Sequence, residues 1–318
     1  MSRQLRLAVV QTPGAPAPGH LDRVGASVVD AARQGAELVL LPELFSSPFH
    51  FDADVWRWAT PRGGQVERFL QALARENRIY LGGSYLEVRG DDFFNTFALA
   101  SPAGEIVGRV GKAHPCSLER CVFAPAPGPR VIVTELGRIG VAICYDNSLR
   151  SEVDGLLAEH PDLWLMPMSA PLPPSSLAGR AGVEAYRVLV RDSPAAMAGH
   201  FGIPFAMANK AGPWVAPMPG WLPTARSSFP GYSQIVDGDG GLLALLGDEP
   251  GLAVADVRCD PTRKRLQVPA DFDRHRPWLG PVTADFRLFP IFEWWGRRRY
   301  RRHPERVTIA RDRSVCHD

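Results

Sequence analysis

Features of an exported, membrane-spanning or nucleic-acid-binding protein are missing from this sequence. The first residues, Met1-Ser2-Arg3-Gln4-Leu5, lack the apolar core of a signal peptide and lead directly into an expected strand. No apolar run approaches the ~18 residues that a membrane-spanning helix needs. The 318 residues carry a formal net charge of only +2, which gives no general attraction to nucleic acid or anionic membranes. We therefore expect a cytoplasmic protein with no membrane and no nucleic-acid partner.

Cysteine is scarce as well. The chain has five cysteines: Cys116, Cys121, Cys144, Cys259 and Cys316. Their odd number and scattered positions favour reduced thiols over a disulfide framework. Cys116 and Cys121 lie close to His114 in the sequence, but no second Cys/His pair has the spacing of a zinc site. We expect neither a metal nor a cofactor.

What the sequence does contain is the material for a large core. Hydrophobic residues make up 45% of the chain and charged residues 22%, as in an ordinary globular protein. Apolar strands and amphipathic helices alternate to about residue 260, with several hairpin turns and no linker between them. We therefore expect one α/β domain with a mixed sheet system rather than two domains.

Two stretches depart from this regular order. Residues 210–230 are rich in proline and glycine and are expected to form a long loop that carries Trp214 and Trp221. The tail shows no clear helix or strand pattern, and its basic cluster at residues 297–302 follows several aromatic residues. Basic and aromatic residues together can bind RNA. In a nearly neutral chain, an arm packed on a partner subunit or a solvated face is the favoured interpretation.

Three polar residues follow directly after apolar strands. Glu43 and Lys112 each come after a short apolar run, and Cys144 follows the run at residues 139–143. Because a helix is expected over residues 149–160, Cys144 lies at a strand-to-helix turn. Such a turn can project a nucleophile from a sheet and place backbone N–H groups beside it. Taken singly, the three residues could also be a solvated loop acid, an exposed turn lysine and a buried structural cysteine.

The sequence around these residues resembles the nitrilase, or carbon–nitrogen hydrolase, superfamily. Three stretches carry the resemblance: Leu40-Leu41-Pro42-Glu43-Leu44-Phe45, Gly111-Lys112-Ala113-His114 and Gly140-Val141-Ala142-Ile143-Cys144-Tyr145-Asp146. Weaker support comes from Asn95-Thr96, from Gly202-Ile203-Pro204 and from the hairpin at residues 233–241. The similarity extends from residue 5 to about residue 257, with the three stretches in the family's order.

The resemblance implies an αββα sandwich, formed by a carbon–nitrogen hydrolase domain at residues 1–275. A basic and aromatic arm at residues 276–318 would follow, and we expect it at a subunit interface. Since dimers are usual in this family, a homodimer or a higher homo-oligomer is expected. The resemblance also implies a catalytic triad of Glu43, Lys112 and Cys144, with Glu119 as an additional glutamate.

These residue types suit the hydrolysis of an amide. A free thiol with a pKa of ~8.5 is mostly protonated at neutral pH, so Cys144 must be activated. Glu43 is expected to accept the thiol proton and later to protonate the leaving ammonia or amine. Lys112 is expected to stabilise the thiolate and the oxyanion, with the backbone N–H of Tyr145 as a second donor. Glu119 is expected to orient the substrate amide or the hydrolytic water.

The residues after the nucleophile indicate which bond is cleaved. Nitrilases proper resemble Cys-Trp-Glu at this point, whereas Tyr145-Asp146 looks more like the amidase and carbamoylase branches. Those branches often place an arginine where this chain has Ser148, so a carboxylate-bearing ω-amide is disfavoured. The aromatic residues at 45–58, Trp214 and Trp221 suggest apolar pocket walls. We expect an amide with an apolar or aromatic acyl part, and a nitrile or an N-carbamoyl compound is the alternative.

The candidate substrate-binding residues are Tyr145, Asn147, Ser169 and Trp214. A different class of function stays open beside the enzyme: a binding or assembly protein on a hydrolase scaffold that uses its tail for contact. The presence of all three triad residue types favours the enzyme. Rapid alkylation of one thiol, Cys144, with loss of activity in step, would separate the two interpretations.

Overall fold

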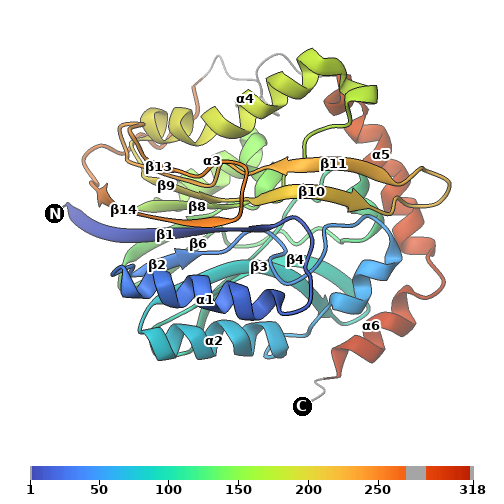
Figure 1. Cartoon of the computed structure of the whole chain (residues 1–318), viewed down its shortest axis with the longest axis horizontal. Coiled ribbons are helices and arrows are strands. Elements are labelled where there is room, and N and C mark those ends of the chain that lie inside the picture. Colours follow the sequence, from blue (N-terminus) through green and yellow to red (C-terminus); the bar gives the residue numbers. More distant parts are fainter. Residues whose placement is uncertain (1, 270–283, 316–318) are drawn as a thin grey trace.

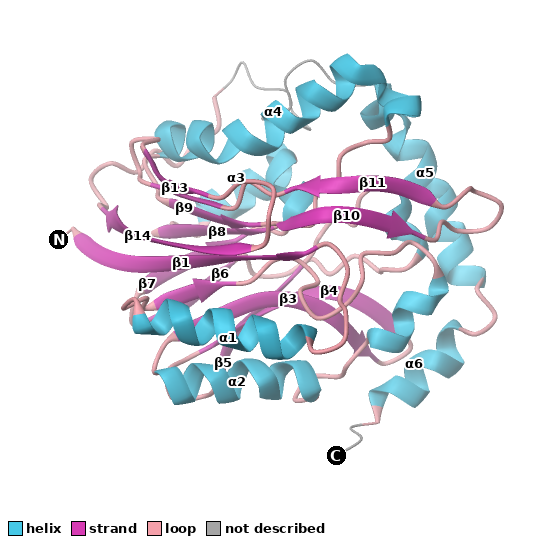
Figure 2. Ribbon diagram, viewed as in Figure 1, coloured by secondary structure: helices cyan, strands magenta, loops and turns pink. Residues whose placement is uncertain are grey.

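Two β-sheets packed face to face form the centre of the molecule in the computed structural model (Figure 1). The structure describes residues 2–269 and 284–315. Helices α1 and α2 lie on the outer face of one sheet, and α3 and α4 lie on the outer face of the other (Figure 2). This arrangement is the αββα sandwich that the sequence predicted. The helices are α1 (His20–Arg33), α2 (Gln65–Asn77), α3 (Arg150–Ala158), α4 (Ser175–Phe201), α5 (Ala284–Arg302) and α6 (Arg306–Ser314).

The first sheet has the order β11-β10-β1-β2-β3-β4-β5, and β14 also pairs with β1. Strands β1, β2 and β3 are parallel, which requires the crossover helices α1 and α2 between them. The remaining neighbours pair antiparallel, apart from a short parallel pairing of β10 with β1. Its strands are β1 (Arg3–Pro13), β2 (Leu38–Leu40), β3 (Tyr80–Arg89), β4 (Asp92–Ala100), β5 (Ile106–Gly111), β10 (Lys210–Ala216), β11 (Ala225–Pro230) and β14 (Gly251–Cys259).

The second sheet has the order β13-β12-β9-β8-β7-β6. Strands β7, β8 and β9 are parallel at its centre, and hairpins close both sides. Its strands are β6 (Val131–Thr134), β7 (Gly137–Val141), β8 (Leu163–Pro167), β9 (Phe205–Ala208), β12 (Gln234–Val236) and β13 (Leu242–Leu245). The parallel strands of both sheets end in loops that carry polar residues, and these loops build the site described below.

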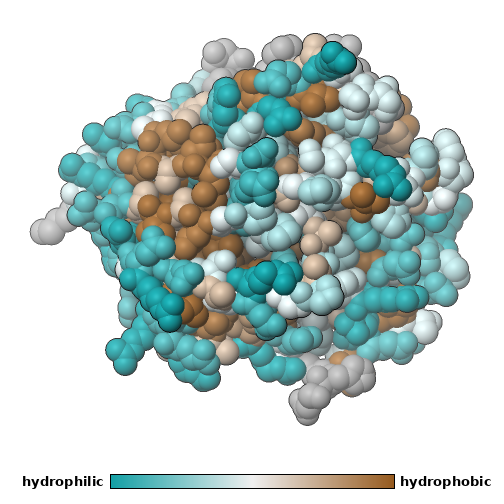
Figure 3. Space-filling model, viewed as in Figure 1, coloured by the Kyte–Doolittle hydropathy of each residue, from teal (hydrophilic) through white to brown (hydrophobic). Residues whose placement is uncertain are grey.

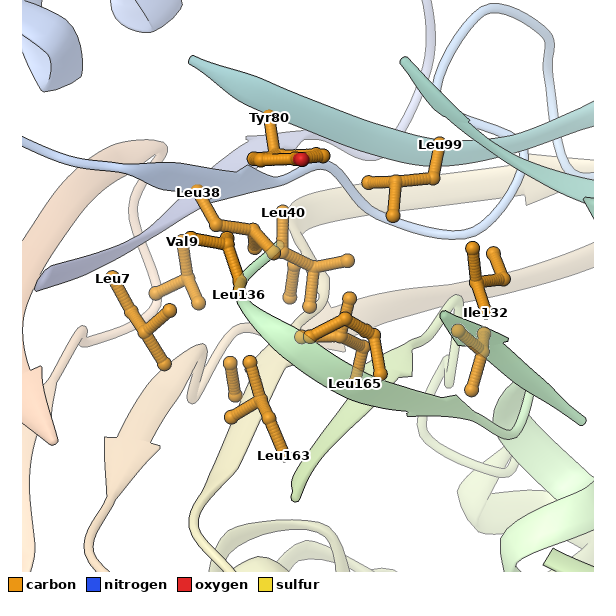
Figure 4. Close-up of a cluster of buried hydrophobic side chains, with 14 of the residues drawn as sticks. Leu7, Val9, Leu38, Leu40, Tyr80, Leu99, Ile132, Leu136, Leu163 and Leu165 are labelled. Carbon is orange, nitrogen blue, oxygen red and sulfur yellow. The ribbon is translucent and has the colours of Figure 1, made fainter. Parts of the chain in front are cut away.

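The core between the sheets consists of aliphatic side chains from both inner faces. Leu7, Val9 and Leu40 of the first sheet point toward Leu163 and Leu165 of the second (Figure 4). All five side chains are fully buried. Burying a side chain of this size contributes roughly 1.5–3 kcal/mol to folding, so this layer fixes the two sheets relative to each other.

Helix α1 illustrates how the sequence pattern becomes packing. Val24, Val28 and Ala31 are buried against the first sheet, at the spacing that places side chains on one face of a helix. The C-terminal Gly35 has a φ of 84°, a left-handed conformation that ends the helix with little strain.

The structure corrects the expected loop at residues 210–230. This segment forms the hairpin of β10 and β11, with only residues 217–224 between the strands. Proline and glycine hid the strand pattern. Pro213 is tolerated because β10 pairs with β1 only at Lys210 and Ala211, so its later residues lack a neighbour on that side.

The tail forms two helices, although its sequence showed no clear pattern. Helices α5 and α6 pack along one end of the sandwich (Figure 1). Tyr300 is buried there, and its hydroxyl accepts a hydrogen bond from the Phe93 N–H at 2.9 Å. The expected domain boundary at residues 275 and 276 lies outside the described residues.

The surface is polar over most of the face shown, with one apolar region over β13 and β14 (Figure 3). Leu242, Leu243 and Leu245 of β13 are each more than 40% exposed. None of the helices within the described ranges combines the length and apolar character needed to cross a bilayer.

Candidate active site

Three strands deliver the residues of the candidate active site to one place. Glu43 follows β2, Lys112 directly follows β5, and Cys144 follows β7 as the first residue of a short 3₁₀-helix, η3 (Cys144–Ser148). Cys144 has a φ of 49°, and Leu44, next to Glu43, has a φ of 48°. Left-handed backbone is unfavourable for such residues and occurs most often at functional turns. The sequence therefore predicted correctly that Cys144 lies at a strand-to-helix turn.

A buried cluster of one ammonium and two carboxylates forms the centre of the site. Lys112 Nζ lies 2.7 Å from Glu43 Oε1 and 2.8 Å from Glu119 Oε1. All three side chains are at most 1% exposed. Burial lowers the pKa of Lys112, but the charges of Glu119 and Glu43 outweigh it and hold the pKa well above its usual value. Lys112 is therefore a fixed positive charge at neutral pH.

Glu43 is held by several neighbours while one of its oxygens is kept unpaired. Asn95 Nδ2 donates to Glu43 Oε1 at 2.7 Å, and Ser84 Oγ donates to Asn95 Oδ1 at 2.7 Å. The backbone carbonyl of Glu43 accepts a 2.7 Å hydrogen bond from Ser169 Oγ. Within the described part of the chain, the buried Glu43 Oε2 has no hydrogen-bond partner. This oxygen can accept a proton from a reacting group.

The surroundings of Cys144 favour the protonated form of its thiol. Burial raises its pKa well above the usual value, and the charge of Glu43 raises it further. Lys112 and a backbone hydrogen bond with Ser169 act in the opposite direction. A proton acceptor is therefore needed as the sulfur attacks. The carboxylate of Glu43, whose charge acts on the thiol, can be that acceptor.

The second glutamate of the cluster is a weaker acid than usual. Burial raises the pKa of Glu119 to about 7, against the opposing effect of Lys112. Its Oε2 accepts a 2.8 Å hydrogen bond from the N–H of Cys116, at the start of the 3₁₀-helix η2 (Ser117–Cys121). Glu119 thus links the lysine to the backbone that follows it.

Asp146 and Asn147 fix the turn that carries the nucleophile. Asp146 accepts 2.9 Å hydrogen bonds from the N–H groups of Ala113 and His114, which joins this turn to the segment of Lys112. Asn147 Nδ2 donates to the carbonyls of Ala142 and Cys144 at 2.8 and 2.9 Å. The side chain of Asn147 therefore holds the turn itself.

A small cavity of about 80 Å³ opens beside Cys144. Its described walls are mostly apolar: Cys116, Cys144, Tyr145, Asn147, Ser148, Met166, Met168, Tyr186, Leu189, Val190, Ser193, Met197 and Phe289. Two of the predicted substrate-binding residues, Tyr145 and Asn147, are among them. Ser169 lies behind the wall, where its hydroxyl supports Glu43.

Trp214 and the aromatic residues of residues 45–58 do not line this cavity. The indole of Trp214 is 5% exposed, packs near Phe49 and Phe229, and donates a 2.8 Å hydrogen bond to the Phe49 carbonyl. Trp221 is 85% exposed. The expected aromatic wall is thus corrected: the apolar wall consists of methionines, aliphatic residues, two tyrosines and Phe289.

Lys210 is a buried part of the site's support that the sequence did not reveal. Its Nζ donates to the carbonyls of Leu44 and Ser47 at 3.0 and 3.2 Å. Burial lowers its pKa to about 7, and the charge of Glu43 works against this shift. Lys210 follows the apolar strand β9 (Phe205–Ala208), but the sequence pattern predicted the start of a loop there.

The described residues contain no group of three or more His, Cys, Asp or Glu side chains placed to hold a metal ion. His114 lies 3.3 Å from Glu152 Oε1, and this contact raises the pKa of the histidine. The cationic centre of the site is the ammonium of Lys112.

Most of the chain matches a known protein family. The model of the carbon–nitrogen hydrolase family matches residues 6–264. The chain belongs to the carbon–nitrogen hydrolase family. The matched segment contains Glu43, Lys112, Glu119 and Cys144.

Relatives within the carbon–nitrogen hydrolases include nitrilases and amidases. Nitrilase 1 of Arabidopsis thaliana is 29% identical over 188 residues, 52% of this chain and 54% of that protein. Deaminated glutathione amidase of Homo sapiens is 27% identical over 295 residues, 86% of this chain and 83% of that protein. The chain spans about half the length of the plant nitrilases that it matches.

Solved carbon–nitrogen hydrolases have the same fold. A structure from Helicobacter pylori G27 gives a TM-score of 0.71 at 19% identity, covering 82% of this chain and 91% of that one. A mutant amidase from Nesterenkonia sp. AN1 gives a TM-score of 0.62 at 25% identity, covering 79% and 90%. In that amidase, the acetamide moiety of fluoroacetamide is covalently attached to the active-site cysteine.

Proposed function

We propose that this carbon–nitrogen hydrolase cleaves the amide of a small acid with an uncharged acyl part, through a thioester on Cys144. The observation that carries the proposal is the buried Glu43–Lys112–Glu119 cluster, whose charges act on the thiol of Cys144. The covalent acetamide adduct on the cysteine of the Nesterenkonia amidase supports the choice of nucleophile.

The reaction begins with attack of the Cys144 sulfur on the amide carbon. The thiol proton passes to Glu43, whose Oε2 has no partner among the described residues. The carbonyl oxygen becomes an oxyanion near the ammonium of Lys112, with the backbone N–H of Tyr145 as the second donor. The carbon–nitrogen bond then breaks, and Glu43 returns the proton to the leaving ammonia or amine.

The second half of the reaction releases the acid. Water attacks the thioester carbon, and Glu43 accepts one of its protons. The carbon–sulfur bond breaks, the acid leaves, and the sulfur recovers its proton. Glu119 holds Lys112 in place through both halves and orients the amide or the water.

The cavity walls favour an uncharged, apolar acyl part. Their described residues include no lysine, arginine, aspartate or glutamate. Arg150, the nearest candidate for a carboxylate partner in the sequence, lies 3.3 Å from Asp154 on its own helix. An acid group on the substrate would therefore lose its hydration without meeting a cation in the described part of the wall.

A nitrile is the second candidate substrate because nitrilases of Arabidopsis thaliana are among the relatives. The same thiol would add to the nitrile carbon, and water would complete the hydrolysis. An N-carbamoyl compound is a third possibility within the same chemistry.

Ammonia release distinguishes these substrates. Wild-type protein and Cys144→Ser are incubated with matched amides, nitriles and N-carbamoyl compounds whose acyl parts are neutral or carry a carboxylate. We expect release from neutral amides by the wild type alone. Ammonia release only from nitriles would mean that the substrate is a nitrile and not an amide. Undiminished release by Cys144→Ser would reject Cys144 as the nucleophile.

A further inference from the structure

The wall of the cavity beside Cys144 includes a residue from outside the segment that matches the family model. Phe289 lies on α5, whereas the match ends at residue 264. The Phe289 ring contacts the ring of Tyr145 edge-on, with 5.7 Å between centroids and 65° between planes. Tyr145 is the residue directly after the nucleophile. Helix α5 therefore reaches the residue next to the reacting cysteine.

Helix α5 is fixed in this position by close packing on η2. Gly296 lies against Arg120 and Cys121, and a Cβ atom at residue 296 would come within 2.9 Å of Arg120 Cβ and 3.1 Å of the Cys121 nitrogen. Only glycine permits this approach. One turn earlier, Glu293 Oε1 accepts a 3.2 Å hydrogen bond from the N–H of Ser117. These contacts hold the helix against the turn that contains Glu119.

Much of the rest of the described wall comes from α4 and the end of β8. Val190 and Met197 are buried on α4, and Met166 is buried at the end of β8. These residues are tied to the core of the second sheet. The described wall of the cavity of about 80 Å³ thus combines residues of the matched family segment with one residue of α5.

We propose that Phe289 is a specificity-determining residue that limits the length of the acyl group. This inference rests on the proposed amide hydrolysis at Cys144 and adds a size limit for the substrate. A phenyl ring that fills part of a small apolar cavity excludes longer or branched acyl groups while small ones still fit. The substrate class is then a short, uncharged aliphatic amide, and α5 sets the limit on the length of its acyl group.

A series of unbranched aliphatic amides from acetamide to hexanamide tests the proposal. The measured quantity is the ratio of kcat/KM for hexanamide to that for acetamide. We expect Phe289→Ala to raise this ratio about tenfold or more relative to wild type, because one methylene group in an apolar pocket is worth about 10-fold or more. Phe289→Trp should lower it.

Trp294→Ala is the matched control. Trp294 lies on the same helix, is 57% exposed and is not among the described residues of this cavity. Its ratio should equal that of wild type. A ratio unchanged in Phe289→Ala, with wild-type thermal unfolding, would overturn the size limit. Equal rises in both variants would show that α5 had shifted as a whole, and would overturn it too.

A second measurement keeps the proposal separate from the proposed function. Cys144 is alkylated with iodoacetamide and with an N-hexyl iodoacetamide, and the two rates are followed by intact mass. In each reaction the sulfur–carbon bond forms, and iodide and the thiol proton leave. Phe289→Ala should speed the bulky reagent selectively. If no amide is hydrolysed but Phe289→Ala still reacts selectively faster with the bulky reagent, the amide proposal fails and the size limit stands. If this selectivity is absent, the size limit fails.

Discussion

At the scale of single residues, the account depends on a lysine that keeps its charge without contact with water. Lys112 is fully buried, and two carboxylates hold its ammonium. A buried charge with these partners is costly to disturb, since removing one partner leaves another charge uncompensated. In the proposed reaction, the same charge stabilises the oxyanion that forms from the amide.

Lys112→Ala should lower kcat/KM for the best amide by about 10²–10³, the usual effect of removing an oxyanion donor. Lys264→Ala is the control, because Lys264 pairs with Asp162 and is not among the described residues of the cavity. Steady-state kinetics on both variants provide the measurement. Turnover near the wild-type value in a folded Lys112→Ala protein would reject the role of Lys112.

Lys210 leads to a prediction about support rather than chemistry. Its ammonium donates to the carbonyls of Leu44 and Ser47, in the loop directly after Glu43. Lys210→Met should lower the free energy of unfolding by about 2 kcal/mol, because buried carbonyls then lose their donor. We expect kcat to fall more than KM rises, since Glu43 would be less well placed.

Denaturant unfolding and initial rates measure these two effects. Lys264→Met is the matched control. It removes a lysine that pairs with Asp162 at 2.5 Å. An unfolding free energy and a kcat equal to those of wild type in Lys210→Met would show that the loop does not need this ammonium.

The sequence predicted some of these residues and not others for a physical reason. Glu43, Lys112 and Cys144 each follow an apolar strand, and functional polar residues often lie just beyond strand ends in α/β folds. Lys210 also follows an apolar strand, β9, but the sequence did not show that its ammonium reaches the carbonyls of Leu44 and Ser47, and Cys116 does not follow a strand directly. Their positions depend on how a hairpin and a 3₁₀-helix pack in three dimensions, which local sequence does not record.

At the scale of secondary-structure elements, α2 is attached to the first sheet by a buried carboxylate as well as by apolar contacts. Glu67 accepts hydrogen bonds from Arg109 at 2.7 and 2.8 Å, from Tyr85 Oη at 2.8 Å and from the Gly63 N–H at 2.7 Å. Burial raises the pKa of Glu67, but these hydrogen bonds outweigh it and leave the pKa below its usual value.

Glu67→Gln should therefore destabilise the fold in a pH-dependent way. A carboxylate whose folded pKa is lowered stabilises the protein above its unfolded pKa and loses this effect as the pH falls through the folded pKa. We expect the variant to be about 3 kcal/mol less stable at pH 7, as for a broken buried pair. The difference should shrink below about pH 4.5, the ordinary range of a glutamate.

Urea unfolding of both proteins between pH 3 and pH 8 measures this dependence. Glu76→Gln on the same helix is the control, because Glu76 is exposed. A stability difference that stays constant across the whole range would contradict the assigned role of the Glu67 charge.

Elements with one clear periodicity were predicted well from the sequence, and elements rich in proline or glycine were not. The sequence predicts a strand over residues 5–11 and a helix over residues 21–34, and the structure has β1 at Arg3–Pro13 and α1 at His20–Arg33. The hairpin of β10 and β11 was expected to be a loop because proline and glycine are rare inside strands. Proline is tolerated where no neighbouring strand needs its N–H, and the local sequence does not show where that is the case. Helix α5 was not expected, since Pro290 and clustered arginines mask its pattern.

At the scale of the whole molecule, two facing sheets turn the ends of separate strands into one site. Glu43 and Lys112 come from the first sheet, and Cys144 comes from the second. The site therefore exists only when the two sheets are stacked. The homodimer and the place of the C-terminal arm at its interface stay predictions, and sedimentation of wild-type protein would test the first of them.

The most direct test of the account is the mass of the protein during turnover. Wild-type protein is mixed with an excess of the amide that releases ammonia fastest, quenched in acid and digested. We predict a mass increase equal to the acyl group on the peptide that contains Cys144, and no increase in Cys144→Ala. Continued ammonia release with the acyl group on another residue, or with none bound at any time point, would contradict the thioester on Cys144.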